Sequence, residues 1–368
     1  MIIPGKRVSQ LGIAVFTALS LVSCVSNSST EPITGQNTAV VEEQDGLEVV
    51  TTFLPITQFT KAVAGDRAEV IQLLPTNIGP HDFQAKPGDV QAIAQADILI
   101  KNGLELEFFL DDLINNAENT DLIIVDSSSG IEPLKFAEQD HDDHDHGDED
   151  DHDHDHGDED DRDHGHEDDR DHDHDHDHDH DHDHDHDREH GHHDHGEFDP
   201  HIWLDPKRAI EQVENIRDAL IAADPEGTEV YTQNAAAFIE ELNSLDAQIT
   251  EQLKPYAGQT FITFHDFANY FAQSYGLRAE FLVDIPEENP SPEDVRRLIE
   301  IVQAEQIQAL LQEQQGNTKA FETLAQDLKI EVSTFDPIET GGSTSTEPTM
   351  YLTIMEQNAT NLADALNE

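Results

Sequence analysis

The stretch LEVVTTFLPITQFTKAVAGDRAEVIQLL, residues 47–74, decides the fold of this chain. Its first seven residues are rich in β-branched side chains and predict a strand. Pro55 then opens a helical pattern that closes at Gly65, and a second strand-like run covers residues 68–74. A strand, a helix and a strand in this order form the repeating unit of a parallel sheet that is covered by helices.

The same alternation extends over most of the 368 residues and is interrupted once, by a long polar stretch. The sequence therefore predicts an α/β protein of two lobes with parallel-rich sheets. Between them we expect one helix over 225–254, about 40 Å long at about 1.5 Å per residue, which would act as a rigid strut. The N-terminal lobe would then cover residues 47–224 and the C-terminal lobe residues 255–368. The predicted helices are 55–63, 87–95, 106–116, 206–222, 225–253, 266–275, 292–304, 318–328 and 350–366, and the predicted strands are 47–53, 68–74, 97–101, 122–125, 260–264, 279–283, 309–311 and 330–334.

The polar stretch, residues 138–197, holds 20 of the 23 histidines of the chain in Asp-His repeats. No apolar side chain occurs between Ala137 and Phe198, so burial cannot compensate the entropy that ordering would cost. We expect a disordered insertion late in the first lobe. Its imidazoles and carboxylates predict many weak sites that collect zinc, and the alternative is a repeat tolerated on the surface.

The N-terminus has the pattern of an export signal. Basic residues precede a short apolar run that ends in LVSC, residues 21–24. This ending is similar to a bacterial lipobox, so we expect a lipoprotein signal peptide over 1–23 and a lipid on Cys24. A plain signal peptide with an incidental cysteine is the alternative. Residues 24–46 predict a flexible tether, and the protein would lie, lipid-anchored, at an extracytoplasmic or periplasmic face.

Charge and cysteine content limit the function classes. The formal net charge of −61 argues against a nucleic-acid partner, because binding phosphates requires basic side chains. Cys24 is the only cysteine, which excludes a disulfide within the chain and a cysteine-based zinc site. Histidine and carboxylate side chains remain as metal ligands.

Three histidines lie outside the polar stretch: His81, His201 and His265. Each lies beside a Pro or Asp at the predicted edge of a strand or helix, where open α/β sheets bind their ligands. Asp336 occupies the equivalent place after the last strand of the second lobe and is the candidate fourth ligand. Three imidazoles and one carboxylate match the tetrahedral coordination of zinc, so we expect Zn²⁺ between the lobes.

Each of these residues also has a purely structural interpretation. A single histidine beside a turn is commonly a cap or a surface residue, and Asp336 before a proline is a possible turn former. Asp205 and Asp266 follow the histidine motifs and would accept an imidazole N–H or cap a helix; Asp205, before Pro206, fits a cap better.

Several of these motifs together resemble one family, the zinc-uptake branch of the metal-binding solute-binding lipoproteins of bacterial ABC transporters. The resemblance runs from about Leu47 to the C-terminus. The motifs that carry it are GPHDFQAKPGDVQAIAQADILIKNGLELE (79–107), DPHIWLDP (199–206), TFITFHDFANYFAQSYGL (260–277), SPEDVRRLIEIVQ (291–303) and STFDPI (333–338).

The resemblance implies two α/β lobes joined by a long helix, with zinc bound by residues that match His81, His201, His265 and Asp336. Manganese-binding relatives carry glutamate in place of His265, which favours zinc here. Pro80 and the lack of cysteines in the second lobe depart from some zinc members, so the fourth ligand stays open.

The function implied is that of a monomeric receptor that captures Zn²⁺ and delivers it to an ABC permease, not that of an enzyme. The alternatives are a receptor for Mn²⁺ or Fe²⁺, a surface zinc buffer or adhesin, and a zinc hydrolase. The sequence has no His-Glu-x-x-His helix, which argues against the hydrolase.

Overall fold

The computed structural model describes residues 46–135, 196–284, 289–305, 307, 309–313 and 318–367. The chain from Gly46 to Glu368 forms one compact unit. The expected signal peptide, the lipidation site at Cys24, nearly all of the tether, and the Asp/His-rich insertion apart from its last residues all lie outside the described residues.

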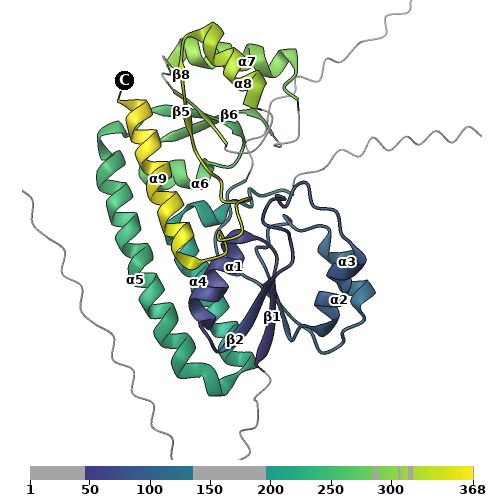
Figure 1. The fold of residues 1–368 in the computed structure, drawn as a ribbon. Coiled ribbons are helices and arrows are strands. Elements are labelled where there is room, and N and C mark those ends of the chain that lie inside the picture. Colours follow the sequence, from purple (N-terminus) through teal and green to yellow (C-terminus); the bar gives the residue numbers. More distant parts are fainter. Residues whose placement is uncertain are drawn as a thin grey trace, which may run out of the picture. The chain divides into compact units, whose positions relative to one another are not determined.

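The first lobe is a four-stranded parallel sheet with helices on both faces (Figure 1). The strand order is β2-β1-β3-β4. In β3 the consecutive residues Ile98, Leu99 and Ile100 are all buried, which requires cover on both sides of the sheet. Helices α1 and α4 pack together on one side, and α2 and α3 on the other. The elements are β1 (Leu47–Thr51), α1 (Leu54–Ala64), β2 (Ala68–Gln72), α2 (Pro87–Gln95), β3 (Ile98–Lys101), α3 (Leu110–Ala117), β4 (Ile123–Asp126), η1 (Ile202–Leu204) and α4 (Pro206–Ala223).

The second lobe repeats this arrangement, with four parallel strands in the order β6-β5-β7-β8. Both sheets therefore place their first strand between the second and the third. The prediction of two α/β lobes with parallel sheets is confirmed. The elements are β5 (Thr260–His265), α6 (Asn269–Tyr275), β6 (Arg278–Val283), α7 (Pro292–Glu305), β7 (Ala309–Gln312), α8 (Thr318–Leu328) and β8 (Glu331–Thr334).

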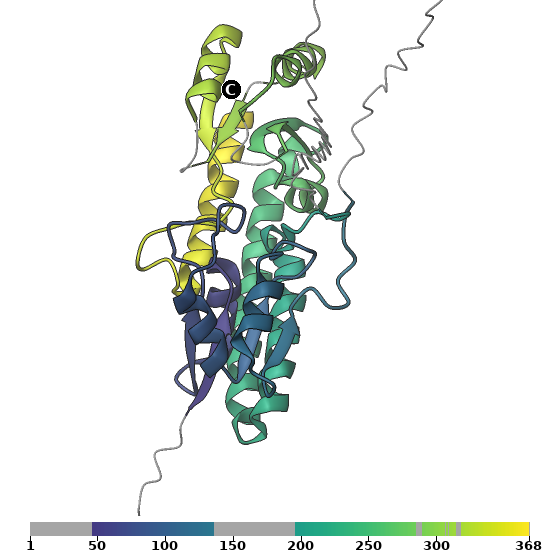
Figure 2. The ribbon, with the colours of Figure 1, turned by 90° about the vertical axis from the view of Figure 1, so that its right-hand side faces the viewer.

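Two long helices accompany both lobes. Helix α5 (Thr228–Leu253), between the short turns η2 (Pro225–Gly227) and η3 (Lys254–Tyr256), is the expected linking helix. Helix α9 (Pro348–Leu366) lies beside it in both views (Figures 1 and 2) and contacts α1 of the first lobe and β8 of the second. The sequence predicts α9 only as the last helix of the second lobe, because its pattern does not reveal which surfaces it covers.

Three helices begin later than predicted. The helix expected from residue 106 begins at Leu110, after a turn in which Leu104 and Glu105 adopt positive φ angles. The buried Glu107 carboxylate stabilises this turn by accepting the backbone N–H groups of Asn102 and Gly103. The helix expected from residue 225 begins at Thr228, after the turn η2, and the helix expected from residue 266 begins at Asn269.

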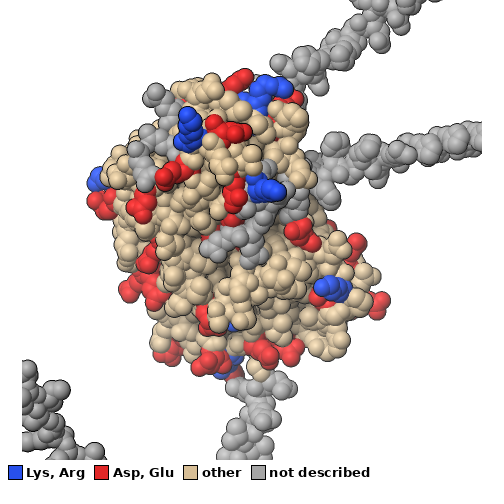
Figure 3. Space-filling model, turned by 45° about the horizontal axis from the view of Figure 1, so that its top comes forward, with Lys and Arg blue, Asp and Glu red and all other residues tan. Residues whose placement is uncertain are grey.

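The surface carries more acidic than basic side chains on the face drawn in Figure 3. This agrees with the formal charge of −61. Among the described residues, every helix is too short or too polar to cross a bilayer.

Candidate metal centre

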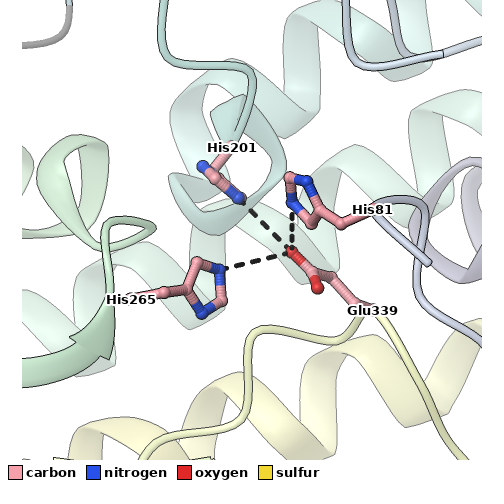
Figure 4. Close-up of side chains that lie close together, drawn as sticks. All are labelled: His81, His201, His265 and Glu339. Atoms are coloured by element: carbon pink, nitrogen blue, oxygen red, sulfur yellow. Dashed lines mark ion pairs between the residues drawn. The ribbon is translucent and has the colours of Figure 1, made fainter. Parts of the chain in front are cut away.

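The three isolated histidines come from different parts of the fold. His81 lies in the loop that follows β2, and His265 is the last residue of β5. His201 directly precedes η1, after the Asp199-Pro200 turn. Glu339 comes from the segment between β8 and α9. The four side chains meet at one point (Figure 4), and their ligand atoms all lie within 4.8 Å of one another.

The imidazole rings surround the Glu339 carboxylate. Ring centroids are 5.6 Å apart for His201 and His265, and 5.9 Å for each pair that includes His81. Glu339 Oε1 lies 3.6 Å from Nε2 of His81, 3.3 Å from that of His201 and 3.7 Å from that of His265. His201, His265 and Glu339 are buried, and His81 is partly exposed.

These separations suit a metal ion better than direct hydrogen bonds. Nε2 of His201, Nε2 of His265 and Glu339 Oε1 are buried and have no hydrogen-bond partner. Four ligands at about 2.1 Å from a tetrahedral ion lie about 3.4 Å from one another, close to the observed nitrogen–oxygen distances. Because an unsatisfied buried polar atom is costly, three of them facing one point, with the His81 ring beside them, indicate a cation site.

In two of the rings, the nitrogen that points away from the cluster also contacts a carboxylate. His201 Nδ1 lies 2.7 Å from Asp199 Oδ1, and His265 Nδ1 lies 2.5 Å from Glu313 Oε1. In each ring Nδ1 faces a carboxylate and Nε2 faces the cluster.

The charges in the cluster shift its protonation equilibria. Burial lowers the pKa of His201, but Asp199 and Glu339 outweigh burial and raise it to about 9. In the same way Glu313 and Glu339 raise the pKa of His265 to about 10 against the effect of burial. Burial raises the pKa of Glu339, but the three histidines hold it well below its usual range. Glu339 is therefore charged at neutral pH.

Asp336, the expected fourth ligand, is not part of this group. Its Oδ1 accepts the backbone N–H of Ile338 at 2.8 Å, which is the turn-forming role. Burial raises the pKa of Asp336 to about 6. Ile338 has a φ of 63°, a backbone conformation that β-branched residues rarely adopt, and the next side chain, Glu339, reaches the histidines.

Sequence reasoning chose Asp336 and missed Glu339, because these two carboxylates lie three residues apart in one loop. The only signal for it is that both belong to the same segment, STFDPIE. Asp205 caps α4 by accepting the backbone N–H of Lys207, as its position before Pro206 predicts. The Asp266 carboxylate accepts a hydrogen bond from the side chain of Asn269.

The chain has two α/β lobes with parallel sheets, a helix shared between them and a histidine–carboxylate cluster. These features define a class, the metal-binding solute-binding proteins. The family model of the zinc-uptake complex component A, periplasmic (ZnuA), matches residues 49–365. The chain therefore belongs to the ZnuA family.

Individual relatives agree with this assignment. The zinc-binding lipoprotein AdcA of Streptococcus pneumoniae is 29% identical over 356 residues, which cover 96% of this chain and 60% of AdcA. The high-affinity zinc uptake system protein ZnuA of Bacillus subtilis is 27% identical over 94% of both chains. Among solved structures, the Zn(II)-bound ZnuA-like domain of S. pneumoniae AdcA has a TM-score of 0.64 and 26% identity, covering 88% of this chain and all of that domain. The chain thus spans about 60% of the length of AdcA but nearly all of the Bacillus protein.

Proposed function

We propose that this protein is the extracytoplasmic receptor of a zinc-uptake ABC transporter. It captures Zn²⁺ as cargo and delivers the ion to a permease in the membrane. The observation that carries the proposal is the meeting of three imidazole nitrogens and one carboxylate oxygen within 4.8 Å of one another, in a cluster where His201, His265 and Glu339 are buried. Membership of a zinc-uptake family supports the same conclusion.

The ligands we propose are His81, His201, His265 and Glu339. Three neutral imidazoles and one carboxylate satisfy the preferred coordination number of zinc and leave one net positive charge. This nitrogen-rich set favours zinc over manganese, which prefers more oxygen ligands. Asp336 then stabilises the turn that presents Glu339.

The cluster has the properties of a carrier site. A catalytic zinc keeps one coordination position open for water or substrate, whereas four protein side chains close the shell. We therefore infer binding without bond chemistry. Capture at a membrane surface follows from the expected lipid on Cys24, which agrees with the naming of AdcA as a lipoprotein.

Metal analysis of the purified full-length chain tests the site. We expect one tightly bound zinc per chain above the weaker binding of the Asp/His-rich insertion. His201→Ala should lose the tight site, and Asn243→Ala, on the exposed side of α5, should keep it. Tight zinc in His201→Ala at the wild-type level would contradict the proposed ligands.

Growth in zinc-depleted medium tests the transport role. Deletion of the gene should impair growth, added zinc should restore it, and a chromosomal His201→Ala should reproduce the defect. Normal zinc uptake in the deletion strain would favour a surface buffer or adhesin. Metal-dependent hydrolysis of an ester, peptide or phosphate that is lost in His201→Ala would instead support an enzyme.

A further inference from the structure

Two buried carboxylates lie directly behind the histidine cluster. Asp199 has no solvent exposure and Glu313 is 7% exposed. Each lies within hydrogen-bond distance of a ring nitrogen, Asp199 of His201 Nδ1 and Glu313 of His265 Nδ1. An ionised carboxylate can only accept, so the hydrogen lies on Nδ1 and the lone pair of each neutral ring lies on Nε2, toward the cluster.

The fold fixes Asp199 from several sides. Its Oδ1 also accepts the backbone N–H of His201 at 2.9 Å, so one oxygen orients both the backbone and the ring of the same residue. Its Oδ2 accepts the side-chain amide of Asn269 at 3.2 Å, and its backbone carbonyl accepts the Tyr270 hydroxyl at 2.7 Å. Asn269 and Tyr270 lie on α6 of the second lobe, so that lobe fixes the residue that orients His201.

The strand register places Glu313 behind His265. Strand β7 pairs in parallel with β5, and Leu311 is opposite Thr263. Two residues further along each segment come His265, the last residue of β5, and Glu313, which directly follows β7. Residues two apart on a strand point to the same face, so the parallel sheet alone brings this carboxylate beside the ring.

We propose that Asp199 and Glu313 are positioning residues that orient His201 and His265 to bind zinc through Nε2 and strengthen both rings as ligands. This inference rests on the proposed zinc-receptor function and adds residues that do not touch the ion. A carboxylate that accepts the N–H of a ligand imidazole fixes its tautomer and raises its basicity. The two carboxylates also place negative charge around the one positive charge that three neutral histidines and Glu339 leave on the bound ion.

Charge-removing variants of the full-length chain test the proposal. In Glu313→Gln and Asp199→Asn the amide oxygen can still accept the ring N–H, but the negative charge is lost. We expect zinc affinity, measured by chelator competition, to fall about 10–100-fold in each variant. Glu313→Leu, which has no acceptor, should lose more than Glu313→Gln, and Glu313→Asp should recover part of the loss. Glu331→Gln, an exposed residue of the neighbouring strand β8, is the matched control and should leave affinity unchanged.

Two further measurements separate positioning from a general loss of structure. The electronic spectrum of the Co²⁺-loaded protein should change in Glu313→Leu, because the His265 ring is no longer fixed. Nitrogen-15 NMR of the zinc-loaded wild type should place hydrogen on Nδ1 of His201 and His265. Thermal unfolding of the metal-free variants identifies any that fail to fold, and for those the NMR result on the wild type decides.

The outcomes are distinct from those of the proposed function. If the wild type binds zinc at the cluster but Glu313→Gln and Asp199→Asn bind equally well, the positioning role is wrong and the receptor function stands. Zinc bound through Nδ1 of either ring would also overturn it. If the wild type lacks a tight zinc site, the proposed function itself fails.

Discussion

The backbone of Ile338 determines which carboxylate reaches the three histidines. Its positive φ follows the turn in which Asp336 accepts the Ile338 N–H, and the chain then directs Glu339 into the cluster. We expect Glu339→Gln to weaken zinc binding by about 100-fold or more, because the substitution changes a direct ligand. Residues that contact only a ligand typically change metal affinity by about 10–100-fold. Asp336→Asn should weaken it by less than about tenfold, because an amide oxygen can still accept the same N–H. Chelator competition measures both, and a larger loss in Asp336→Asn than in Glu339→Gln would assign Asp336 to the ion instead.

Protonation of the histidines determines how zinc affinity depends on pH. The pKa is raised from 6.5 to about 9 for His201 and to about 10 for His265, so zinc must displace protons at neutral pH. Affinity should fall as pH is lowered from about 9 to 7, by about tenfold per pH unit for each proton displaced. Calorimetry at pH 7.5 in two buffers of different ionisation enthalpy should show proton release.

The stability of the metal-free protein should follow the opposite trend. Raised histidine pKa values stabilise the fold fully below about 6.5, the unfolded value, and this contribution is lost as pH rises through about 9 to 10. Binding heats that do not depend on the buffer would show that the rings are already neutral and contradict both trends.

The sequence predicts the histidines of the cluster better than its carboxylates. Only three isolated histidines exist, and each lies at an element edge, so His81, His201 and His265 are the natural candidates. Acidic residues are abundant, and which of them meets the rings depends on one turn at Ile338 and on the strand register beside β5. Neither feature is visible in hydrophobic periodicity, so Glu339 and Glu313 were not predicted.

At the scale of elements, the segment that carries Glu339 follows β8 of the second lobe and is fastened by hydrogen bonds to the first lobe. Trp203, which is fully buried and lies in η1, donates its indole N–H to the Pro337 carbonyl at 2.8 Å. In the same lobe, Gly341 N–H donates to the Thr76 carbonyl and the Gln58 amide donates to the Ser345 carbonyl, both at 2.6 Å. These contacts hold the turn in which Glu339 points at the histidines.

Trp203→Phe should loosen this segment without removing a ligand. The buried Pro337 carbonyl would lose its donor, so we expect the unfolding free energy to fall by about 1–3 kcal/mol. Zinc affinity should fall by less than about tenfold, the lower end of the range for residues that contact a ligand. Urea unfolding and chelator competition measure the two effects. Tyr231→Phe is the control. It removes the hydrogen bond that the buried Tyr231 hydroxyl donates to Asp224, and it should leave zinc affinity unchanged. Unchanged stability in Trp203→Phe would contradict the fastening role.

Periodicity predicts the elements well and their termini less well. The β-α alternation identifies both parallel sheets, because strands buried on both faces and proline-started helices leave clear patterns. The predictions were wrong at the starts of α3, α5 and α6. At α3 and α6 side chains bind the backbone or one another near the helix start, and residues before α5 form the separate turn η2. The role of α9 on both lobes depends on tertiary packing alone.

At the scale of the whole molecule, one hydrophobic core continues from the first lobe into the second. It joins Phe53 and Trp203, whose rings are 5.0 Å apart, with Phe267 and Phe335, whose rings are 5.4 Å apart. Tyr351 of α9 adds a hydrogen bond to the Trp203 carbonyl. A wide rotation between the lobes would expose this core to water, at about 25 cal/mol for each Å² of apolar surface.

We therefore expect zinc release to involve local movement and no wide hinge. Spin labels at Asn116→Cys on α3 and Glu300→Cys on α7, both exposed positions, report the distance between the lobes by electron paramagnetic resonance. The labels require Cys24→Ser, because Cys24 is the only native cysteine. The distance should change by no more than about 1–2 Å between zinc-loaded and metal-free protein, as for pre-organised binding proteins. A second label pair, Asn116→Cys on α3 with Thr232→Cys on α5, is the control. The change in its distance between the two states gives the variation that label motion alone produces. A shift of the first pair well beyond that range would show that the continuous core opens, and the two lobes would then have to act as separate bodies during delivery.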